Sequence, residues 1–325
     1  RGHGGVTTTY DDTVAAWRPL LEEVLADYPL PAVRVSLVQD LVNTSFRLQA
    51  DGVAWYLRLY ARNRHRSAEL ISEAILVEAL GAAGANVPTL HRTRAGAPVR
   101  RGERHAVVFA WLTGTTKKEE RTTGDYAALG ELLGRVHGFV DAWTPPAEFA
   151  RPLLDPIPAS EWLREIPTPL RSDLMRVRER WEGVASEMAG VEGTRGLIHA
   201  DPSFGNVLFQ DRRPYLIDFD DCALGFRAYD LAVVLAGAWG RSAFAENRAA
   251  LLRGYRSVRP LSENEETALP VFMAGRAASL ILWLIRQDRN HPWLDGQVER
   301  LREFLTLDGS GRASSHRHDD SIYGW

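Results

Sequence analysis

The stretch that decides the fold lies in the second half of the chain and reads Leu197-Ile-His199-Ala-Asp201-Pro-Ser-Phe-Gly-Asn206-Val-Leu-Phe209, followed after a turn at 211–214 by Tyr215-Leu-Ile-Asp218-Phe-Asp220-Asp221. Short apolar runs, typical of strands, end beside acidic groups, and an amide side chain lies between them. Transfer of a phosphoryl group from ATP requires an acceptor hydroxyl held in line, a carboxylate that takes its proton, and oxygen ligands for Mg²⁺. This stretch supplies the carboxylate and the oxygen ligands.

The spacing within the stretch assigns a role to each polar residue. Asp201 is the expected catalytic residue that faces the acceptor hydroxyl. Asn206 and Asp218 are the expected catalytic metal ligands, because hard Mg²⁺ prefers amide and carboxylate oxygens. His199 is flanked by apolar residues, so we expect it to fix the loop through a buried hydrogen bond and not to act as the base. Asp230 immediately precedes an expected helix, where an aspartate can cap the N-terminus.

The sequence before this stretch predicts a β-rich first part. Strands are expected at 33–38, 46–49 and 54–60 as an antiparallel meander, and a continuous apolar strand follows at 106–112. Apolar residues that recur at three and four positions predict helices at 14–25 and 67–80.

The remainder of the sequence is predicted to be mostly helical. Helices are expected at 126–139, 160–181, 230–239, 243–257, 263–288 and 294–305. The longest apolar stretches, 231–239 and 277–285, are short of the roughly 20 residues that cross a bilayer, so no membrane partner is expected.

The motifs resemble the catalytic core of the aminoglycoside phosphotransferase and choline kinase group of protein-kinase-like enzymes. That group carries His-Gly-Asp-x-His-x-x-Asn, then Ile-Asp-Phe-Glu/Asp, and then Gly-x-x-x-x-Asp-Leu-Ala, which Gly225 to Ala232 resembles. Ile-Asp-Phe-Asp-Asp at 217–221 is similar to the homoserine-kinase-like and bacterial Ser/Thr stress-kinase branch. The resemblance covers roughly residues 30 to 305. Ser203 departs from the pattern, because the group often has histidine there.

The resemblance implies an α+β, protein-kinase-like bilobal fold, with an N-terminal antiparallel β-sheet lobe that carries one key helix and a mostly helical C-terminal lobe. We expect a flexible N-terminus at 1–12, the nucleotide-binding lobe at 13–112, the catalytic and acceptor-binding lobe at 113–305, and a disordered tail at 306–325. In the group, the aspartate at position 230 also helps to brace the catalytic loop.

The resemblance also implies the activity. The expected function is transfer of the γ-phosphoryl group of ATP, with Mg²⁺, to a hydroxyl of a small metabolite or antibiotic. Two alternatives stay open: a kinase that acts on Ser or Thr of a peptide or protein, and a nucleotide-binding pseudokinase that regulates a partner. The segment 286–299 mixes acidic and basic residues, so the sequence does not favour a polycationic aminoglycoside.

Candidate phosphate-binding residues follow from the same resemblance. Arg58 occupies the place of the phosphate-binding lysine of kinases, and a guanidinium can hold phosphate oxygens and a carboxylate together. The alternative is an edge-strand arginine in solvent. Glu73 is expected to orient Arg58, and Glu69, one helical turn earlier, is its rival.

Two further segments are candidates for binding the nucleotide. Thr44 and Ser45 lie in the first expected turn, where small polar residues can offer N–H and hydroxyl groups to phosphate oxygens or simply form a polar turn. The strand that contains Phe109 and Trp111 is the expected hinge, whose apolar side chains and free backbone edge suit adenine.

Composition excludes several other classes of protein. With 39 basic and 42 acidic residues, the net charge of -3 gives no large positive field for nucleic acid or an anionic membrane. The single cysteine, Cys222, excludes an internal disulfide and a cysteine-built zinc site. Because the first twelve residues also lack an apolar secretory segment, we expect a cytoplasmic protein, either a monomer or a homodimer.

Overall fold

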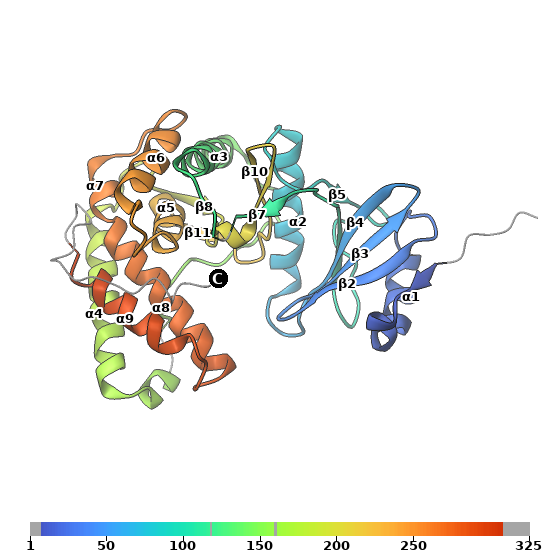
Figure 1. The fold of residues 1–325 in the computed structure, drawn as a ribbon, viewed down its shortest axis with the longest axis horizontal. Helices are drawn as coiled ribbons and strands as arrows, with labels where there is room; N and C mark the ends of the chain where they lie inside the picture. The colour runs from blue at the N-terminus through green and yellow to red at the C-terminus, as the bar shows by residue number, and fades with distance from the viewer. Residues whose placement is uncertain (1–7, 118, 159–160, 308–325) are drawn as a thin grey trace, which may run out of the picture. The chain divides into compact units, whose positions relative to one another are not determined.

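The structure is a computed structural model that describes residues 8–117, 119–158 and 161–307. The chain divides into two compact units, Arg1–Gly114 with Pro145–Arg151, and Thr115–Thr144 with Pro152–Trp325 (Figure 1). Most of the predicted flexible N-terminus and disordered tail, residues 1–7 and 308–325, lies outside the described residues.

The first unit is built on a six-stranded sheet with the order β1-β2-β3-β4-β6-β5 (Figure 1). Its strands are β1 (Thr9–Tyr10), β2 (Arg34–Asp40), β3 (Thr44–Ala50), β4 (Val53–Leu59), β5 (Leu90–His91) and β6 (Ala106–Ala110). β1 pairs with β2 in parallel, and the other pairs are antiparallel. The predicted antiparallel meander is therefore confirmed, and the two-residue strands β1 and β5 are additions to it.

Apolar side chains at alternate positions of the strands form the core of this unit. Phe46 and Leu48 on β3 and Leu57 on β4 belong to one buried cluster with Val14 and Leu21. Val14 lies in the 3₁₀ helix η1 (Asp12–Trp17) and Leu21 in α1 (Arg18–Ala26), because a proline in the first turn of α1 restarts the helix that the sequence predicts as one. α2 (Ser67–Ala82) is the one long helix described in the unit.

The second unit is mostly helical. Its helices are α3 (Thr123–Ala142), η2 (Glu161–Glu165), α4 (Thr168–Glu187), η3 (Phe204–Asn206), α5 (Arg227–Ala236), α6 (Phe244–Arg256), α7 (Glu263–Thr267), α8 (Leu269–Gln287) and α9 (Leu294–Phe304). α3 and α6 approach closely through glycines, because a Cβ atom at Gly130 would lie 2.1 Å from the carbonyl oxygen of Leu251. This close packing fixes α3, which carries His137, beside the rest of the unit.

Two small antiparallel sheets within the helical unit carry the predicted catalytic stretch. The first has the order β10-β9-β7, and the second pairs β11 with β8. These strands are β7 (Thr115–Thr116), β8 (Arg195–Ile198), β9 (Val207–Gln210), β10 (Arg213–Leu216) and β11 (Ala223–Phe226).

Helix α8 differs from the expectation drawn from the apolar stretches. It is long and apolar enough to cross a membrane by length and composition, although 61% of the apolar window is buried inside the structure. Because it packs against α4, α5 and α9, it has the character of a core helix.

Candidate active site

Strand pairing brings the predicted catalytic residues together. β9 pairs with β10 so that Val207 lies opposite Leu216, and the N–H of Ile217 donates to the carbonyl oxygen of Asn206 at 3.0 Å. β8 pairs with β11 so that Ile198 lies opposite Ala223. The loop after β8, which carries Asp201, and the loop after β10, which carries Asp218, therefore lie side by side.

A hydrogen bond to the main chain orients the side-chain amide of Asn206. Its Nδ2 donates to the carbonyl oxygen of Asp201 at 3.0 Å, so the Oδ1 atom is the end of the side chain that remains for a cation. Asp218 follows β10 and has a left-handed backbone with φ of 66°. A residue with a Cβ atom adopts this conformation at a cost, and such residues recur at functional sites. An amide oxygen beside a carboxylate is a ligand set that suits Mg²⁺.

His199 fixes the catalytic loop through both ring nitrogens. Nε2 lies 3.0 Å from the carbonyl oxygen of Ile217, and Nδ1 lies 3.3 Å from the N–H of Asp201. Because a carbonyl only accepts and an amide N–H only donates, we assign the proton to Nε2. The buried ring has no lone pair left for an acceptor hydroxyl, so these contacts agree with the expected loop-fixing role.

Asp230 braces the same loop from α5. Its carboxylate accepts the N–H groups of His199 and Ala200, each at 2.8 Å. The prediction that Asp230 caps a helix is wrong, because α5 begins at Arg227 and Asp230 lies inside it, fully buried. Ala200 has φ of 67°, which places an alanine in a conformation that favours glycine.

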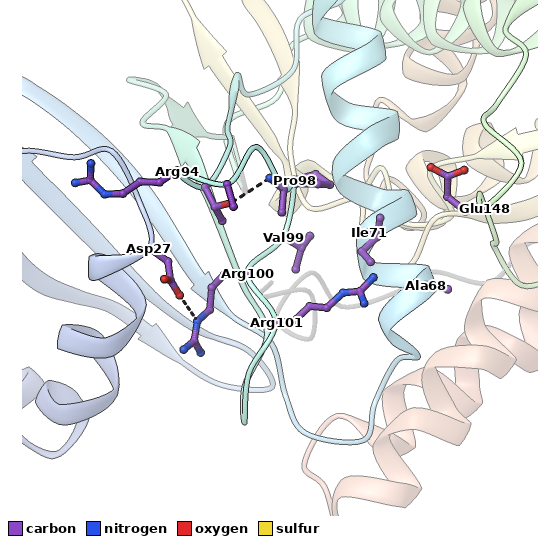
Figure 2. A pocket seen from close by; sticks show the side chains of 12 residues that line it. Asp27, Ala68, Ile71, Arg94, Pro98, Val99, Arg100, Arg101 and Glu148 are labelled. Atoms are coloured by element: carbon purple, nitrogen blue, oxygen red, sulfur yellow. Dashed lines mark hydrogen bonds and ion pairs between the residues drawn. The ribbon is translucent and has the colours of Figure 1, made fainter.

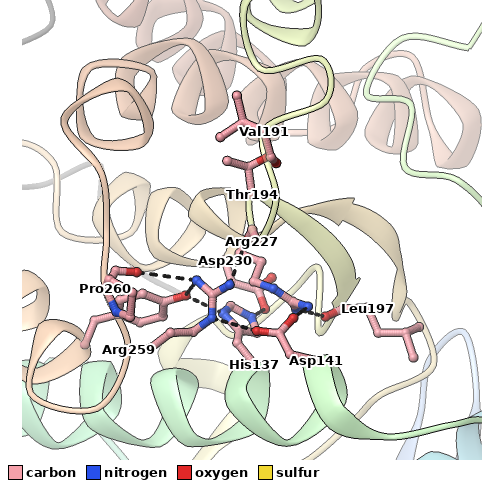
Figure 3. A network of polar contacts seen from close by, with 11 residues as sticks. His137, Asp141, Val191, Thr194, Leu197, Arg227, Asp230, Arg259 and Pro260 are labelled. Carbon is pink, nitrogen blue, oxygen red and sulfur yellow. Dashed lines mark hydrogen bonds and ion pairs between the residues drawn. The ribbon is translucent and has the colours of Figure 1, made fainter.

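A buried histidine, which the sequence analysis did not single out, completes the hydrogen bonds of Asp230. His137 Nε2 lies 3.1 Å from Asp230 Oδ2, and His137 Nδ1 lies 2.9 Å from the hydroxyl of Tyr255 (Figure 3). Burial lowers the pKa of His137, and the hydrogen bond to Asp230 opposes this only in part. We therefore take the imidazole as neutral, with Nε2 donating to the carboxylate and Nδ1 accepting from the Tyr255 hydroxyl.

Two arginines hold the strand before the loop. Arg227, almost fully buried, donates to the carbonyl oxygen of Leu197 at 2.9 Å and forms an ion pair with Asp141. Arg259 donates through Nε to the other carboxylate oxygen of Asp141 at 3.0 Å (Figure 3). Burial lowers the pKa of Arg227, and Asp141 opposes this shift. An arginine inside the apolar run 223–236 is a sequence signal that could have indicated this network.

Arg276 is a further residue of the site that no sequence motif indicated. It lies on α8, and its Nη2 donates to Asp201 Oδ1 at 2.7 Å. The other carboxylate oxygen, Oδ2, accepts no hydrogen bond from the described residues. A charged arginine inside an apolar helix was again the available signal.

In the first unit, the structure pairs Arg58 with Glu73. Arg58 Nη1 donates to Glu73 Oε1 at 3.2 Å, and the Tyr60 hydroxyl donates to Glu73 Oε2 at 2.8 Å. The alternative of a solvent-exposed edge-strand arginine is wrong, because β4 lies between β3 and β6 and Arg58 is buried. Glu69 caps the start of α2 instead, where its carboxylate accepts from Arg66.

Thr44 and Ser45 do not lie in a turn. Both are buried residues of β3, and the turn is formed by residues 41–43. Thr44 donates to Asp40 Oδ1 at 2.8 Å, and the Ser45 hydroxyl is 2.6 Å from that of Tyr56. The expectation of a polar turn at these residues is wrong because they belong to β3. Their hydroxyls can be buried there because they pair with other protein groups.

The predicted hinge strand does not have the expected free backbone edge at Phe109 and Trp111. Phe109 on β6 pairs with Leu90 on β5, and the N–H of Trp111 donates to the carbonyl oxygen of Ala54 at 3.0 Å. The prediction of a free backbone edge is therefore wrong at these two residues. At Leu112, by contrast, neither backbone group is hydrogen-bonded to the described part of the chain.

Asp220 and Cys222, which follow Asp218 in the chain, are both buried. Asp220 is buried, which is unusual for a loop carboxylate. Cys222 is a fully buried thiol whose N–H donates to the carbonyl oxygen of Phe219. Burial of the thiol fits a packing role.

A pocket of about 620 Å³ lies elsewhere in the first unit, between α2 and the segment 93–101 (Figure 2). Arg94, Arg100 and Arg101 line it together with Asp27 and Glu148. None of the six predicted nucleotide-binding residues lines this pocket, so it is separate from them.

Comparison with known proteins places the chain in a family. The sequence model of the phosphotransferase enzyme family matches residues 36–265, which is most of the chain. The chain belongs to the phosphotransferase enzyme family. Members of this family use ATP, and this chain is a kinase that phosphorylates an alcohol group of a small metabolite or antibiotic.

Relatives and solved structures agree with this assignment. Homoserine kinase of Gluconobacter oxydans is 31% identical over 284 residues, covering 82% of this chain and 84% of that protein. Homoserine kinase of Methylobacterium nodulans is 30% identical over 310 residues, covering 89% and 90%. In fold, a microcompartment-associated aminopropanol kinase matches with a TM-score of 0.74 at 23% identity, covering 89% of this chain and 96% of that one. The amicoumacin kinase hAmiN also has a TM-score of 0.74, at 18% identity, covering 93% and 95%. The predicted protein-kinase-like fold is confirmed.

Proposed function

We propose that this phosphotransferase uses MgATP to phosphorylate the hydroxyl of a small acceptor that also carries an amino group. The observation that carries the proposal is the grouping of Asp201, Asn206 and Asp218 around the backbone of Ile217. The choice of acceptor is supported by the relatives, because homoserine and aminopropanol share a hydroxyl and an amine.

Asp201 performs the acceptor-side chemistry in this proposal. The acceptor oxygen attacks the γ-phosphorus of ATP, the bond from that phosphorus to the bridging oxygen breaks, and ADP leaves with the bonding electrons. The hydroxyl proton passes to Asp201 Oδ2, which accepts no hydrogen bond from the described residues, while Oδ1 is held by Arg276. His199 is not a competing base because both ring nitrogens are engaged.

The remaining residues hold the nucleotide. Asn206 Oδ1 and Asp218 are the proposed ligands of Mg²⁺, which when bound neutralises charge on the β- and γ-phosphates. Arg58, oriented by Glu73, binds the α- and β-phosphates. The backbone N–H and C=O of Leu112 pair with adenine, since both are available for it.

The test is phosphate transfer from MgATP to a panel of homoserine, aminopropanol, an aminoglycoside and a serine-containing peptide, with products identified by mass. We expect product with the first two compounds, and a loss of at least about 100-fold in kcat for Asp201→Asn with ATP binding unchanged. Phosphorylation of the peptide alone, or an Asp201→Asn variant with more than about a tenth of the wild-type kcat, contradicts the proposal.

A further inference from the structure

Arg276 brings a positive charge directly to the predicted catalytic carboxylate. α8 packs against α5, the helix that carries Asp230 and so braces the catalytic loop. The faces of α8 differ, because Ala274, Ala277 and Ala278 are buried whereas Arg276 is only half-buried. This packing leads the guanidinium of Arg276 to Asp201 at 2.7 Å.

The contact between these residues uses only one end of the guanidinium. Nη2 donates to Asp201 Oδ1, and neither Nε nor Nη1 donates to any of the described residues. A guanidinium has five N–H donors in a planar fork, so most of the donors of Arg276 remain for another group. On the carboxylate, Oδ2 likewise remains for the acceptor hydroxyl.

The free N–H donors of Arg276 favour an anionic group on the acceptor at this place, beside the two carboxylates, Asp201 and Asp221, whose charges already act on the guanidinium. A second carboxylate bound to the free donors of Arg276 gains charge-assisted hydrogen bonds. An acceptor whose amine approaches the same place instead meets like charge. The hydroxyl of a carboxylate-bearing acceptor would then be bound through Oδ2 of Asp201 while its carboxylate is bound by the arginine that holds Oδ1.

We propose that Arg276 binds a carboxylate of the acceptor, so that the enzyme selects small hydroxy amino acids over the amino alcohols that lack this group. The inference rests on the proposed function and narrows its acceptor class. Arg276 is then a specificity-determining residue, in addition to any part it has in orienting Asp201.

The face of α8 beyond Arg276 agrees with a small acceptor. Leu280 and Trp283 follow at four and seven positions, which places them on the same side of the helix. Leu280 is half-buried and Trp283 is 36% exposed. These apolar side chains offer no further charged partner, so carboxylate recognition on this face falls to Arg276.

The experiment compares acceptors that differ only by the carboxylate. Homoserine is paired with 3-amino-1-propanol and serine with ethanolamine, and kcat/KM is measured for the wild type, Arg276→Gln and Arg276→Lys. The wild type should favour the carboxylate-bearing member of the productive pair by about 10- to 100-fold, the value of a hydrogen-bonded charge pair. In Arg276→Gln this preference should fall to within a few-fold of unity, mainly through KM of the hydroxy amino acid, and Arg276→Lys should restore part of it.

Controls distinguish recognition of the acceptor carboxylate by Arg276 from a loss of folding and from a loss of the contact that orients Asp201. Arg135→Gln removes an exposed arginine that also pairs with a carboxylate, Glu131, and should leave the preference unchanged. The shift in melting temperature with MgATP should be retained in both Arg276 variants, which shows that they are folded.

Three outcomes overturn the inference. The first is a wild-type enzyme that prefers the amino alcohol. The second is an Arg276→Gln variant in which kcat/KM falls equally for both members of a pair, because Arg276 would then act only through Asp201. The third is no turnover of any member of either pair, which also removes the proposed function, whereas the first two leave phosphorylation of small amino-bearing alcohols intact.

Discussion

The imidazole of His137 donates through Nε2 to Asp230 Oδ2 at 3.1 Å, and that same oxygen accepts the N–H of His199 at 2.8 Å. A histidine on α3 thereby stabilises the carboxylate that holds the catalytic loop. The loop depends on a buried imidazole that must stay neutral to accept from Tyr255 at Nδ1.

This dependence predicts how stability changes with pH. Burial lowers the pKa of His137, so the unfolded chain binds its proton more readily than the folded chain. The stabilisation that neutral His137 gives to the folded state is therefore fully present above the unfolded pKa of about 6.5. As the pH falls below that value, the free energy of unfolding decreases by at most about 1.4 kcal/mol per pH unit.

Urea denaturation between pH 8 and 5 (roughly the range in which histidine titrates) measures this effect. The difference in unfolding free energy between the wild type and His137→Gln should be largest at the alkaline end and shrink toward the acid end. His91→Gln, at a less buried histidine whose pKa is also lowered by burial, should show a smaller trend. A constant difference for His137→Gln across the range contradicts the assignment of a neutral ring.

The proposed metal ligands, Asn206 and Asp218, are tested by thermal melts with ATP and Mg²⁺. Asp218→Ala should abolish the Mg²⁺-dependent part of the ATP-induced rise in melting temperature, because the carboxylate ligand is lost. Asn206→Ala should weaken it less, since one neutral oxygen is removed. Asp173→Ala, at a partly buried carboxylate that pairs with Arg302 and Arg176 and is not a predicted metal ligand, serves as the control. A full metal-dependent shift in Asp218→Ala would remove that residue from the site.

The Arg58–Glu73 pair is tested by substitution of each partner. Arg58→Ala should raise KM for ATP and lower kcat, because a charge-assisted contact to phosphate is lost. Arg58→Lys should reduce kcat/KM by about 5- to 150-fold if the planar fork is needed, which corresponds to roughly 1 to 3 kcal/mol.

A double-mutant cycle decides which glutamate is coupled to the arginine. Arg58→Ala combined with Glu73→Gln should be strongly non-additive, whereas Arg58→Ala combined with Glu69→Gln should add within about 0.5 kcal/mol. The reverse pattern would assign the orienting role to Glu69. Wild-type kinetics in Arg58→Ala would show that this strand does not contact the nucleotide.

The left-handed backbone of Ala200 gives a stability prediction. Its φ of 67° costs a residue with a Cβ atom roughly 1 to 2 kcal/mol, which glycine avoids at the expense of a more flexible unfolded chain. Ala200→Gly should thus leave the unfolding free energy unchanged or raise it by up to about 1 kcal/mol. Ala249→Gly, at an exposed position of helix α6, should lower it by about 1 kcal/mol. Calorimetry of the two variants checks the contrast, and an Ala200→Gly loss as large as that of Ala249→Gly would contradict the strain.

The parts of the site that could be predicted from sequence are those whose residues are close in the chain. Asp201, Asn206 and Asp218 lie at the ends of three consecutive short strands, β8, β9 and β10, so the strand ends and the turn in the sequence indicate that these residues lie close together. His137 and Arg276 could not be placed in the same way. They lie 93 and 75 positions from Asp230 and Asp201, and no periodicity records a pairing over such a separation.

The incorrect predictions also have physical causes. All residues of α5 are buried, so no amphipathic pattern marks its first turn, and the sequence pattern places the start of the helix at Asp230. β5 has two residues, too few for any alternation, so the sequence does not indicate that it covers the edge at Phe109. Thr44 and Ser45 have the composition of a turn, but side-chain partners allow their hydroxyls to be buried in a strand.

Ile217 joins the loop that carries Asp201 to the proposed metal ligand Asn206 with main-chain atoms alone, since its N–H donates to Asn206 and its carbonyl accepts from His199. A comparison of side chains between related enzymes does not detect these main-chain hydrogen bonds. Evolution is free to exchange one apolar residue for another here without moving the chemistry, and proline, which lacks the N–H, is the replacement that would cut the joint. The position is therefore a place where drift in sequence carries no information about drift in function.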